Sequence, residues 1–167
     1  MCRPGRSLIL LLSVAGSGCG SYRPPPPHTA FENWPASGSL ADARFAGLTS
    51  CKSDPSTMRC RRNGIFLLGK GPFNAAVDLR SADGSGGFDQ LTIWHDRDQY
   101  AVYTIADELV RQGWTACATG ENERGDQNIY TLPGAPVKFS MDLSYWGKRR
   151  IRMLPTWNTR ERGCSPQ

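Results

Sequence analysis

Residues 1–18 limit most strongly what this chain can fold into. They contain Arg3 and Arg6 and no acidic residue, followed by a mainly apolar run from Leu8 to Ala15 and by small residues up to Gly18. This order of basic, apolar and small segments is typical of a secretory signal peptide. We therefore expect the rest of the chain to fold outside the cytoplasm, in a compartment where cysteines are oxidised to disulfides.

The end of this segment, Gly16-Ser17-Gly18-Cys19, resembles the lipobox of bacterial lipoproteins. In that family the signal is removed before the lipobox cysteine, which carries fatty acyl chains such as palmitate. The resemblance covers the N-terminus alone and implies that Cys19 is the lipidation site. Gly16 stands where the family has an aliphatic residue, and ordinary signal cleavage after Gly16 is the alternative. Because Gly20 is not aspartate, the resemblance implies the outer membrane if the cell is Gram-negative.

The cysteine count agrees with an acylated Cys19. The chain has six cysteines, of which Cys2 is removed with the signal. The four that then remain are Cys51, Cys60, Cys117 and Cys164. Three pairings are open, and we favour Cys51 with Cys60 because the loop between them is short and polar. The other two cysteines then pair with each other, and free buried thiols are the alternative.

The segment after Cys19 is expected to separate the anchor from a folded body. Residues 19–38 contain four consecutive prolines, Pro24 to Pro27, which favour an extended polyproline II spacer. We interpret this segment as a tether, with a proline-rich ligand for another domain as the alternative. Residues 39–167 are then one disulfide-stapled domain, in keeping with a length of 167 residues and a hydrophobic content of 39%.

Turn residues and apolar periodicity predict an α+β fold for this body. We expect a mainly antiparallel sheet of about six or seven short strands, with one amphipathic helix packed on one face and a short N-terminal helix. The short helix is expected at residues 39–47, where Ser39 and Asp42 match a capping box. The strands are expected at residues 65–68, 75–80, 88–94, 114–119, 128–132, 137–145 and 149–154.

Residues 97–112 give the clearest helical pattern, because their apolar side chains recur at helical spacing. Asp96 stands at the N-cap position, Gln99 completes a capping box, and Gly113 fits the residue that ends the helix. A strand is expected immediately before this helix and another after it. The pattern therefore predicts a right-handed crossover between parallel neighbouring strands.

One short segment brings a histidine and two carboxylates together. His95, Asp96 and Asp98 are residue types that act as general bases or metal ligands. Helix capping explains the two aspartates equally well. A cell-envelope hydrolase that uses His95 with Asp96 or Asp98 is thus an alternative hypothesis.

A glycine-rich segment offers a second candidate site. Asp83 and Asp89 flank several glycines, and carboxylate and carbonyl oxygens are the ligands that Ca²⁺ prefers. A hairpin turn explains the same residues. The chain carries no nucleotide-binding or multi-histidine pattern, and we expect no cofactor.

Charge is divided unevenly along the chain. Residues 137–167 hold seven basic and two acidic residues, net +5, whereas residues 19–136 hold 11 basic and 13 acidic residues, net −2. Arginine, tryptophan and tyrosine dominate the hot spots of protein interfaces. A solvated strand face is the alternative. We expect a partner-binding ribbon formed by Tyr145, Trp146, Lys148, Arg149, Arg150, Arg152 and Trp157.

These features predict a non-enzymatic lipoprotein of the cell envelope that faces the periplasm and binds a protein partner. In anatomy only, it resembles small lipoproteins that inhibit toxins or give immunity to them, and accessory subunits of envelope assemblies. The compartment argues against nucleic acid as a partner, and contact with the membrane is expected through the N-terminal anchor. A small-ligand or Ca²⁺-binding module and the hydrolase are the alternatives.

Overall fold

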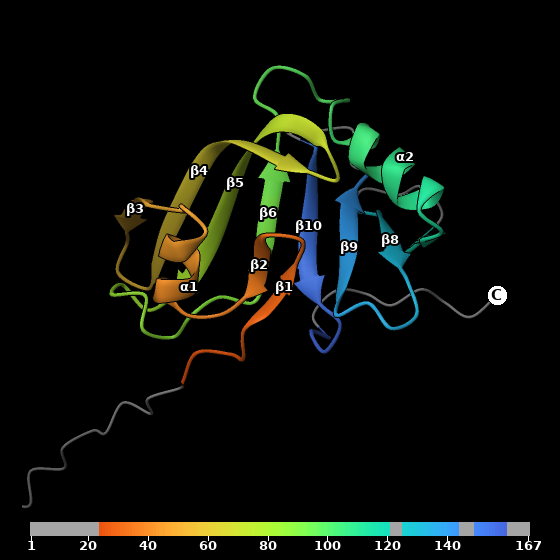
Figure 1. Cartoon of the computed structure of the whole chain (residues 1–167). Helices are drawn as coiled ribbons and strands as arrows, with labels where there is room; N and C mark the ends of the chain where they lie inside the picture. Colours follow the sequence, from red (N-terminus) through yellow and green to blue (C-terminus); the bar gives the residue numbers. More distant parts are fainter. Residues whose placement is uncertain (1–23, 121–124, 144–148, 160–167) are drawn as a thin grey trace, which may run out of the picture.

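The computed structural model describes residues 24–120, 125–143 and 149–159 (Figure 1). Within these ranges the chain is mostly β, with ten strands and only two short helices, α1 (Leu40–Phe45) and α2 (Tyr103–Arg111). The strands are β1 (Thr29–Phe31), β2 (Trp34–Ser37), β3 (Ser50–Ser53), β4 (Thr57–Leu67), β5 (Lys70–Arg80), β6 (Leu91–Trp94), β7 (Thr115–Ala118), β8 (Gln127–Thr131), β9 (Val137–Asp142) and β10 (Arg150–Pro155). The predicted α+β fold is therefore wrong.

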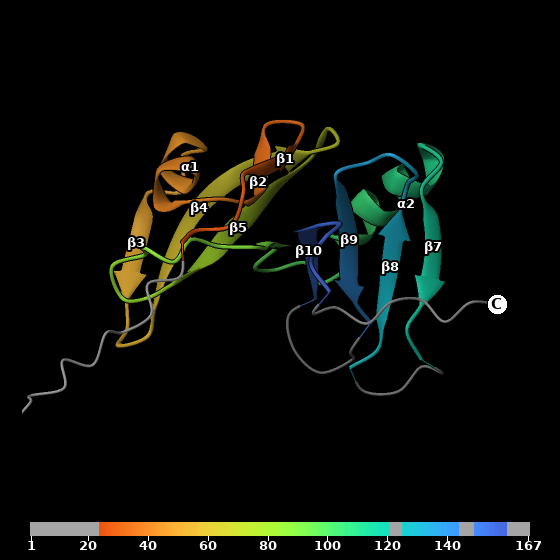
Figure 2. The ribbon, with the colours of Figure 1, turned by 90° about the horizontal axis from the view of Figure 1, so that it is seen from below.

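The described strands form two antiparallel sheets. Eight of them make one sheet in the order β3-β4-β5-β6-β10-β9-β8-β7, and β1 pairs with β2 in a hairpin of its own. Figure 2 shows β3, β4 and β5 with α1 on one side of the molecule, and β7, β8 and β9 with α2 on the other. The pairing of β6 with β10 joins these two groups.

The strand order overturns the predicted crossover between neighbouring strands. The chain does pass from β6 through α2 to β7, but β10, β9 and β8 lie between these two strands in the sheet. The reason is that β8, β9 and β10 form the expected antiparallel meander, and its last strand takes the place beside β6. Strand β7, which follows helix α2 in the chain, therefore lies at the far edge of the sheet.

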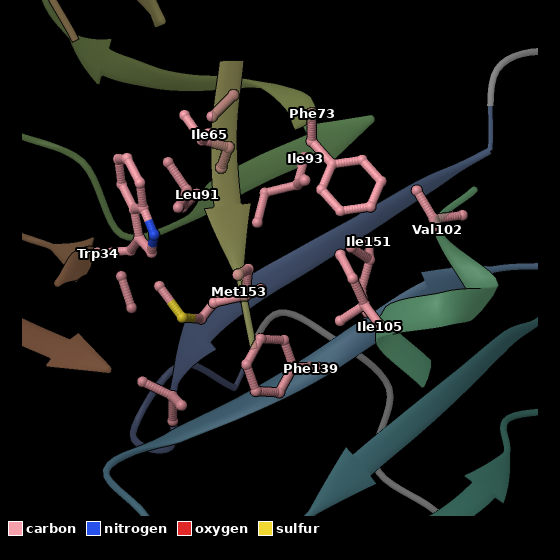
Figure 3. Close-up of a cluster of buried hydrophobic side chains, with 14 of the residues drawn as sticks. Trp34, Ile65, Phe73, Leu91, Ile93, Val102, Ile105, Phe139, Ile151 and Met153 are labelled. Carbon is pink, nitrogen blue, oxygen red and sulfur yellow. The ribbon is translucent and has the colours of Figure 1, made fainter. Parts of the chain in front are cut away.

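One face of the large sheet forms the hydrophobic core. Alternate residues of the central strands point to it, and Leu91, Ile93, Ile151 and Met153 on β6 and β10 are fully buried. Burial of each such side chain contributes about 1.5–3 kcal/mol. Figure 3 shows how the cluster brings β2, β4, β5, β6, α2, β9 and β10 together through Trp34, Ile65, Phe73, Leu91, Ile93, Val102, Ile105, Phe139, Ile151 and Met153.

The β1–β2 hairpin covers this core face in front of β6 and β10 (Figure 1). Phe31 makes edge-to-face contacts with Trp114 and Phe139, each at 5.6 Å between ring centres. The Trp34 indole Nε1 donates a hydrogen bond of 2.7 Å to the carbonyl of Phe66. Residues 29–37, which the sequence analysis placed in the tether, are thus part of the packed body, before the expected boundary at residue 39.

The proline run before this hairpin also touches the body. The carbonyl of Pro27 accepts a hydrogen bond of 2.7 Å from the Ser37 hydroxyl. Gly87, with a φ of +62°, lies so close to the run that a Cβ there would come within 2.6 Å of the Pro25 Cβ. A free spacer therefore does not describe Pro24 to Pro27 in this structure.

Helix α1 confirms the capping box predicted from the sequence. The Ser39 hydroxyl accepts a hydrogen bond of 3.3 Å from the Asp42 backbone N–H, and the Ser39 backbone N–H donates to the Asp42 carboxylate at 2.7 Å. The hydrogen bond from the Ser39 backbone N–H, and then a second one of 2.7 Å that the Ser39 hydroxyl donates to the same carboxylate, lower the pKa of Asp42.

Helix α2 is shorter than predicted, and its expected cap is wrong. It starts at Tyr103 rather than about residue 97, and its N-cap, Val102, makes no side-chain capping bond. The reason is local: His95 Nδ1 accepts a hydrogen bond of 2.8 Å from the Asp98 backbone N–H, which holds this segment as a turn. The carboxylate of Asp96 is engaged with Trp94 and Asn74 instead.

The disulfide between Cys51 and Cys60 is confirmed. The two residues are direct cross-strand partners of β3 and β4, and Cys60 is fully buried. Cys117 is also disulfide-bonded, and its expected partner Cys164 lies outside the described residues. The lipidation site predicted at Cys19 lies outside them as well.

Removing the Cys51–Cys60 disulfide should destabilise the edge of the sheet. We expect the double variant Cys51→Ala/Cys60→Ala to lose about 3 kcal/mol of unfolding free energy, because the cross-link limits the conformations of the unfolded chain. Urea unfolding followed by tryptophan fluorescence measures this loss. An unchanged urea midpoint would show that the disulfide adds nothing to stability.

Glu108 is the one acidic side chain of α2 that is buried. Its carboxylate accepts hydrogen bonds from Arg111 and from the Gln112 amide, the latter at 2.8 Å, and lies 3.6 Å from Lys70 Nζ at the start of β5. The hydrogen bond from Arg111, then that from Gln112, lowers the pKa of Glu108 from 4.5 to about 2. This carboxylate therefore ties α2 to the β4–β5 hairpin.

The ionised Glu108 should make stability depend on acid pH. Because its folded pKa lies below its unfolded value, the stabilisation is complete above pH 4.5 and is lost as the pH falls toward about 2. We expect Glu108→Gln to lower the melting temperature at pH 7 and to reduce its fall between these pH values. Asp107→Asn, on the exposed side of α2, is the matched control and should keep the parent profile. Identical profiles for Glu108→Gln and the parent would contradict this role.

Candidate interaction site on the outer face of the sheet

The face of the large sheet opposite the core carries two rows of side chains that run across the strands. Arg61, Ala76, Thr92 and Arg152 are successive cross-strand partners on β4, β5, β6 and β10. Residues paired in this way point to the same face of a sheet. Two arginines therefore flank a strip of small residues, Ala76 and Thr92.

The second row brings an aromatic ring to this face. Asn63, Asn74, Trp94 and Arg150 are successive partners on the same four strands. The Trp94 indole Nε1 donates a hydrogen bond of 2.9 Å to the Asp96 carboxylate, which also accepts one of 2.7 Å from the Asn74 amide. The Trp94 ring is thus held in a fixed orientation beside Arg150.

These rows line a hollow of about 550 Å³, within the usual range for ligand sites. A smaller hollow of about 160 Å³, lined by Ser50, Lys52, Arg59 and Arg61, continues it to the edge of the sheet at β3. We call the larger hollow the basic trough; its lining residues are Ser50, Arg59, Arg61, Arg62, Asn63, Asn74, Trp94, Asp96 and Arg150.

The arginines on this face differ in how their charge is balanced. Arg59 lies 3.4 Å from the Asp78 carboxylate, and Arg152 lies 2.5 Å from that of Asp142. By contrast, no carboxylate of the described residues forms an ion pair with Arg61 or Arg150. Arg62, which also lines the trough, forms no such ion pair either. Three arginines of the trough therefore lack a counter-ion from this part of the chain.

Arg61 leans across the sheet toward Trp94. Its guanidinium carbon lies 5.9 Å from the centre of the Trp94 ring, although these residues are on β4 and β6, with β5 between them. The β5 partner of Arg61 is Ala76, whose small side chain leaves room for this path. Arg150 is the direct cross-strand partner of Trp94, and Arg61, Trp94 and Arg150 all line the trough.

Arg62 and Arg149, although basic, serve other contacts. Arg62 donates a hydrogen bond of 2.8 Å to the Ala46 carbonyl and lies 5.2 Å from the centre of the Trp34 ring, on the core side. The guanidinium of Arg149 lies 4.7 and 5.0 Å from the ring centres of Tyr100 and Tyr103, near the start of α2. Both arginines therefore hold the fold together.

The predicted partner-binding ribbon is only partly gathered on this face. Arg150 and Arg152 lie on it, whereas Arg149 packs on the tyrosines. Trp157, 45% exposed, lines a different hollow with Pro24 to Pro27. Tyr145, Trp146 and Lys148 lie outside the described residues.

Sequence reasoning missed Arg59, Arg61 and Trp94. The first two alternate with Cys60, and such alternation indicates one face of a strand. The residues between Cys51 and Cys60 were instead interpreted as a polar loop and Arg61 was assigned to no element, so the signal was overlooked. The position of Trp94 against Arg150 depends on the pairing of two strands far apart in the sequence, and the sequence alone gave no sign of it.

The other candidate sites are not assembled. His95 caps its own turn, and Asp96 is turned toward Trp94 and Asn74 rather than toward the histidine. Among the residues that the structure describes, no group of three or more His, Cys, Asp or Glu side chains is arranged to hold a metal ion.

The two aspartates proposed for Ca²⁺ also have other contacts. The Asp83 carboxylate accepts a hydrogen bond of 2.9 Å from the Ser85 backbone N–H, which lowers the pKa of Asp83. The Asp89 carboxylate lies 4.0 Å from the Arg80 guanidinium. Their local roles are thus a turn and an ion pair.

No protein-family model, curated protein or solved structure matches this chain. In the described part of the chain, neither helix has the length and apolar character needed to cross a membrane. The geometry and charge of the basic trough are therefore the observations that bear on its role.

The charge balance of the trough gives a stability prediction. Arg61→Gln and Arg150→Gln should each change the unfolding free energy by less than about 0.5 kcal/mol, because neither guanidinium has a counter-ion among the described residues. Arg152→Gln should cost about 1 kcal/mol or more, because it leaves the half-buried Asp142 carboxylate without this partner. Urea unfolding of the three variants distinguishes these cases. A loss for Arg61→Gln as large as that for Arg152→Gln would show that Arg61 is structural.

Proposed function

We propose that this protein is a non-enzymatic binding module of the bacterial cell envelope that binds a protein partner through the basic trough and the adjoining outer face of β10. The observation that carries the proposal is the presence in one trough of Arg61, which lies over the Trp94 ring, and Arg150, the cross-strand partner of Trp94, neither with a counter-ion from the described residues. Arginine and tryptophan are enriched among the residues that contribute most to protein–protein binding.

The extent of the surface favours a macromolecular partner. The trough continues toward β3 through the smaller hollow and toward β9 through the Arg152–Asp142 pair, so the polar surface spans several strands. A partner covering such a face would desolvate the arginines, and electrostatic complementarity would speed its association. An acidic protein surface fits this charge.

The location in the envelope is supported by the signal-like N-terminus and by the Cys51–Cys60 disulfide, because disulfides persist in oxidising compartments. Anchoring through Cys19 and a position at the periplasmic side of the outer membrane follow from the lipobox-like segment. Within this setting, an inhibitor or immunity protein and an accessory subunit of an envelope assembly both need a stable domain with one binding face.

Capture of partners from cross-linked envelopes tests the proposal. The full-length, anchored protein should retain one partner in near-stoichiometric amount, and Arg61→Glu should lose it. Arg44→Glu changes the net charge equally at an exposed position on α1 and should retain the partner. The substitution of a trough cation by a carboxylate repels an acidic partner, so the loss should be specific.

Two results would contradict the proposal. Equal recovery of the partner with folded Arg61→Glu and with the parent would exclude the trough as the interface. Failure of the parent to retain any protein under conditions that preserve its fold would argue against a protein-binding module.

A further inference from the structure

We infer that the basic trough is a carboxylate-binding site, which takes one aspartate or glutamate side chain of the partner between Arg61 and Arg150, beside the Trp94 ring. The inference rests on the proposed function and specifies the group that the trough recognises.

Arg61 and Arg150 bring two like charges to the lining of the same trough. Arg61 reaches across β5 to the Trp94 ring, and Arg150 is the cross-strand neighbour of that tryptophan. Like charges brought together without counter-ions repel each other. An anion bound between them removes this repulsion and forms charge-assisted hydrogen bonds with both.

Asp96 adds a negative charge to the trough lining. The Asp96 carboxylate lies at the same site, where the Trp94 indole and the Asn74 amide hold it. Its negative charge lowers the net positive charge of the trough lining. Because the proposed partner is a protein, the anions that it presents to the trough are the carboxylates of aspartate and glutamate.

The shape of the arginine side chains also suits a carboxylate. The planar fork of a guanidinium matches the two oxygens of a carboxylate. Ala76 and Thr92 are buried under the side chains of this face, and the fixed Trp94 ring lines the trough beside Arg61.

A labelled acidic decapeptide of alternating glutamate and serine is the probe that tests the inference, with fluorescence anisotropy of the full chain in detergent as the readout. The same peptide with glutamine in place of glutamate should bind at least about ten-fold more weakly, because it lacks the carboxylates. Arg61→Gln and Arg150→Gln should each weaken binding of the acidic peptide about ten-fold. The double variant should be little weaker than either single one, because both residues hold the same group.

Two matched variants separate a built site from general charge attraction. Arg44→Gln removes one exposed positive charge outside the trough and should leave peptide binding unchanged. Arg61→Lys keeps the charge but loses the planar fork, and it should weaken binding as well. Equal weakening by Arg44→Gln and Arg61→Gln would overturn the inference, and so would full binding by Arg61→Lys.

Competition identifies the chemistry of the ligand. Acetate should displace the acidic peptide at lower concentration than inorganic phosphate does. Stronger displacement by phosphate would overturn the carboxylate assignment. Peptide binding that fails while Arg61→Glu still loses a captured partner would refute this inference alone, whereas peptide binding without any captured partner would refute the proposed function alone.

Discussion

The antiparallel pairing of β6 with β10 is the constraint on which the rest of the structure depends. It joins the strands from β3 to β6 with those from β7 to β10 into one sheet (Figure 2). On one side it places Leu91 and Ile93 against the β1–β2 hairpin and α2. On the other side it sets Arg150 beside Trp94. The same register therefore forms both the core and the candidate site.

The arginines on the outer face differ in how their charge is balanced. The pairs Arg59–Asp78 and Arg152–Asp142 offset charge within the sheet, whereas Arg61 and Arg150 do not meet a carboxylate in the described part of the chain. Proteins commonly retain such uncompensated groups where binding requires them, at some cost in stability. In this account, a partner supplies the missing negative charge.

The features that the sequence predicted correctly depend on neighbouring residues. The capping box of Ser39 with Asp42, the Cys51–Cys60 disulfide and the meander of β8, β9 and β10 all join residues close in the chain. The α+β assignment was wrong because strands β1, β2 and β3 were not predicted and because the helix expected after residue 97 is shorter than its pattern indicated. The hydrogen bonds of His95 and Asp96 hold its first turns out of the helix.

The candidate site was only half predicted, because its two sides come from distant segments. The basic residues of β10 stood out by composition, whereas Arg61 and Trp94 join them only through the pairing of β4, β5, β6 and β10. The β1–β2 hairpin escaped prediction for a similar reason. Its two strands are short, and Pro35 lies within the second of them. The packing of Phe31 depends on Phe139 and Trp114, which lie far along the chain.

The most direct test of the central claim is a nuclear magnetic resonance titration of the isotope-labelled protein with the acidic peptide, observing tryptophan indole and arginine Nε signals. The account predicts saturable shifts of the Trp94 indole and of the Arg61 and Arg150 Nε groups, with the Trp34 indole on the core side unchanged. Shifts confined to Trp34 or Trp157, with Trp94 and the two arginines unaffected, would contradict it.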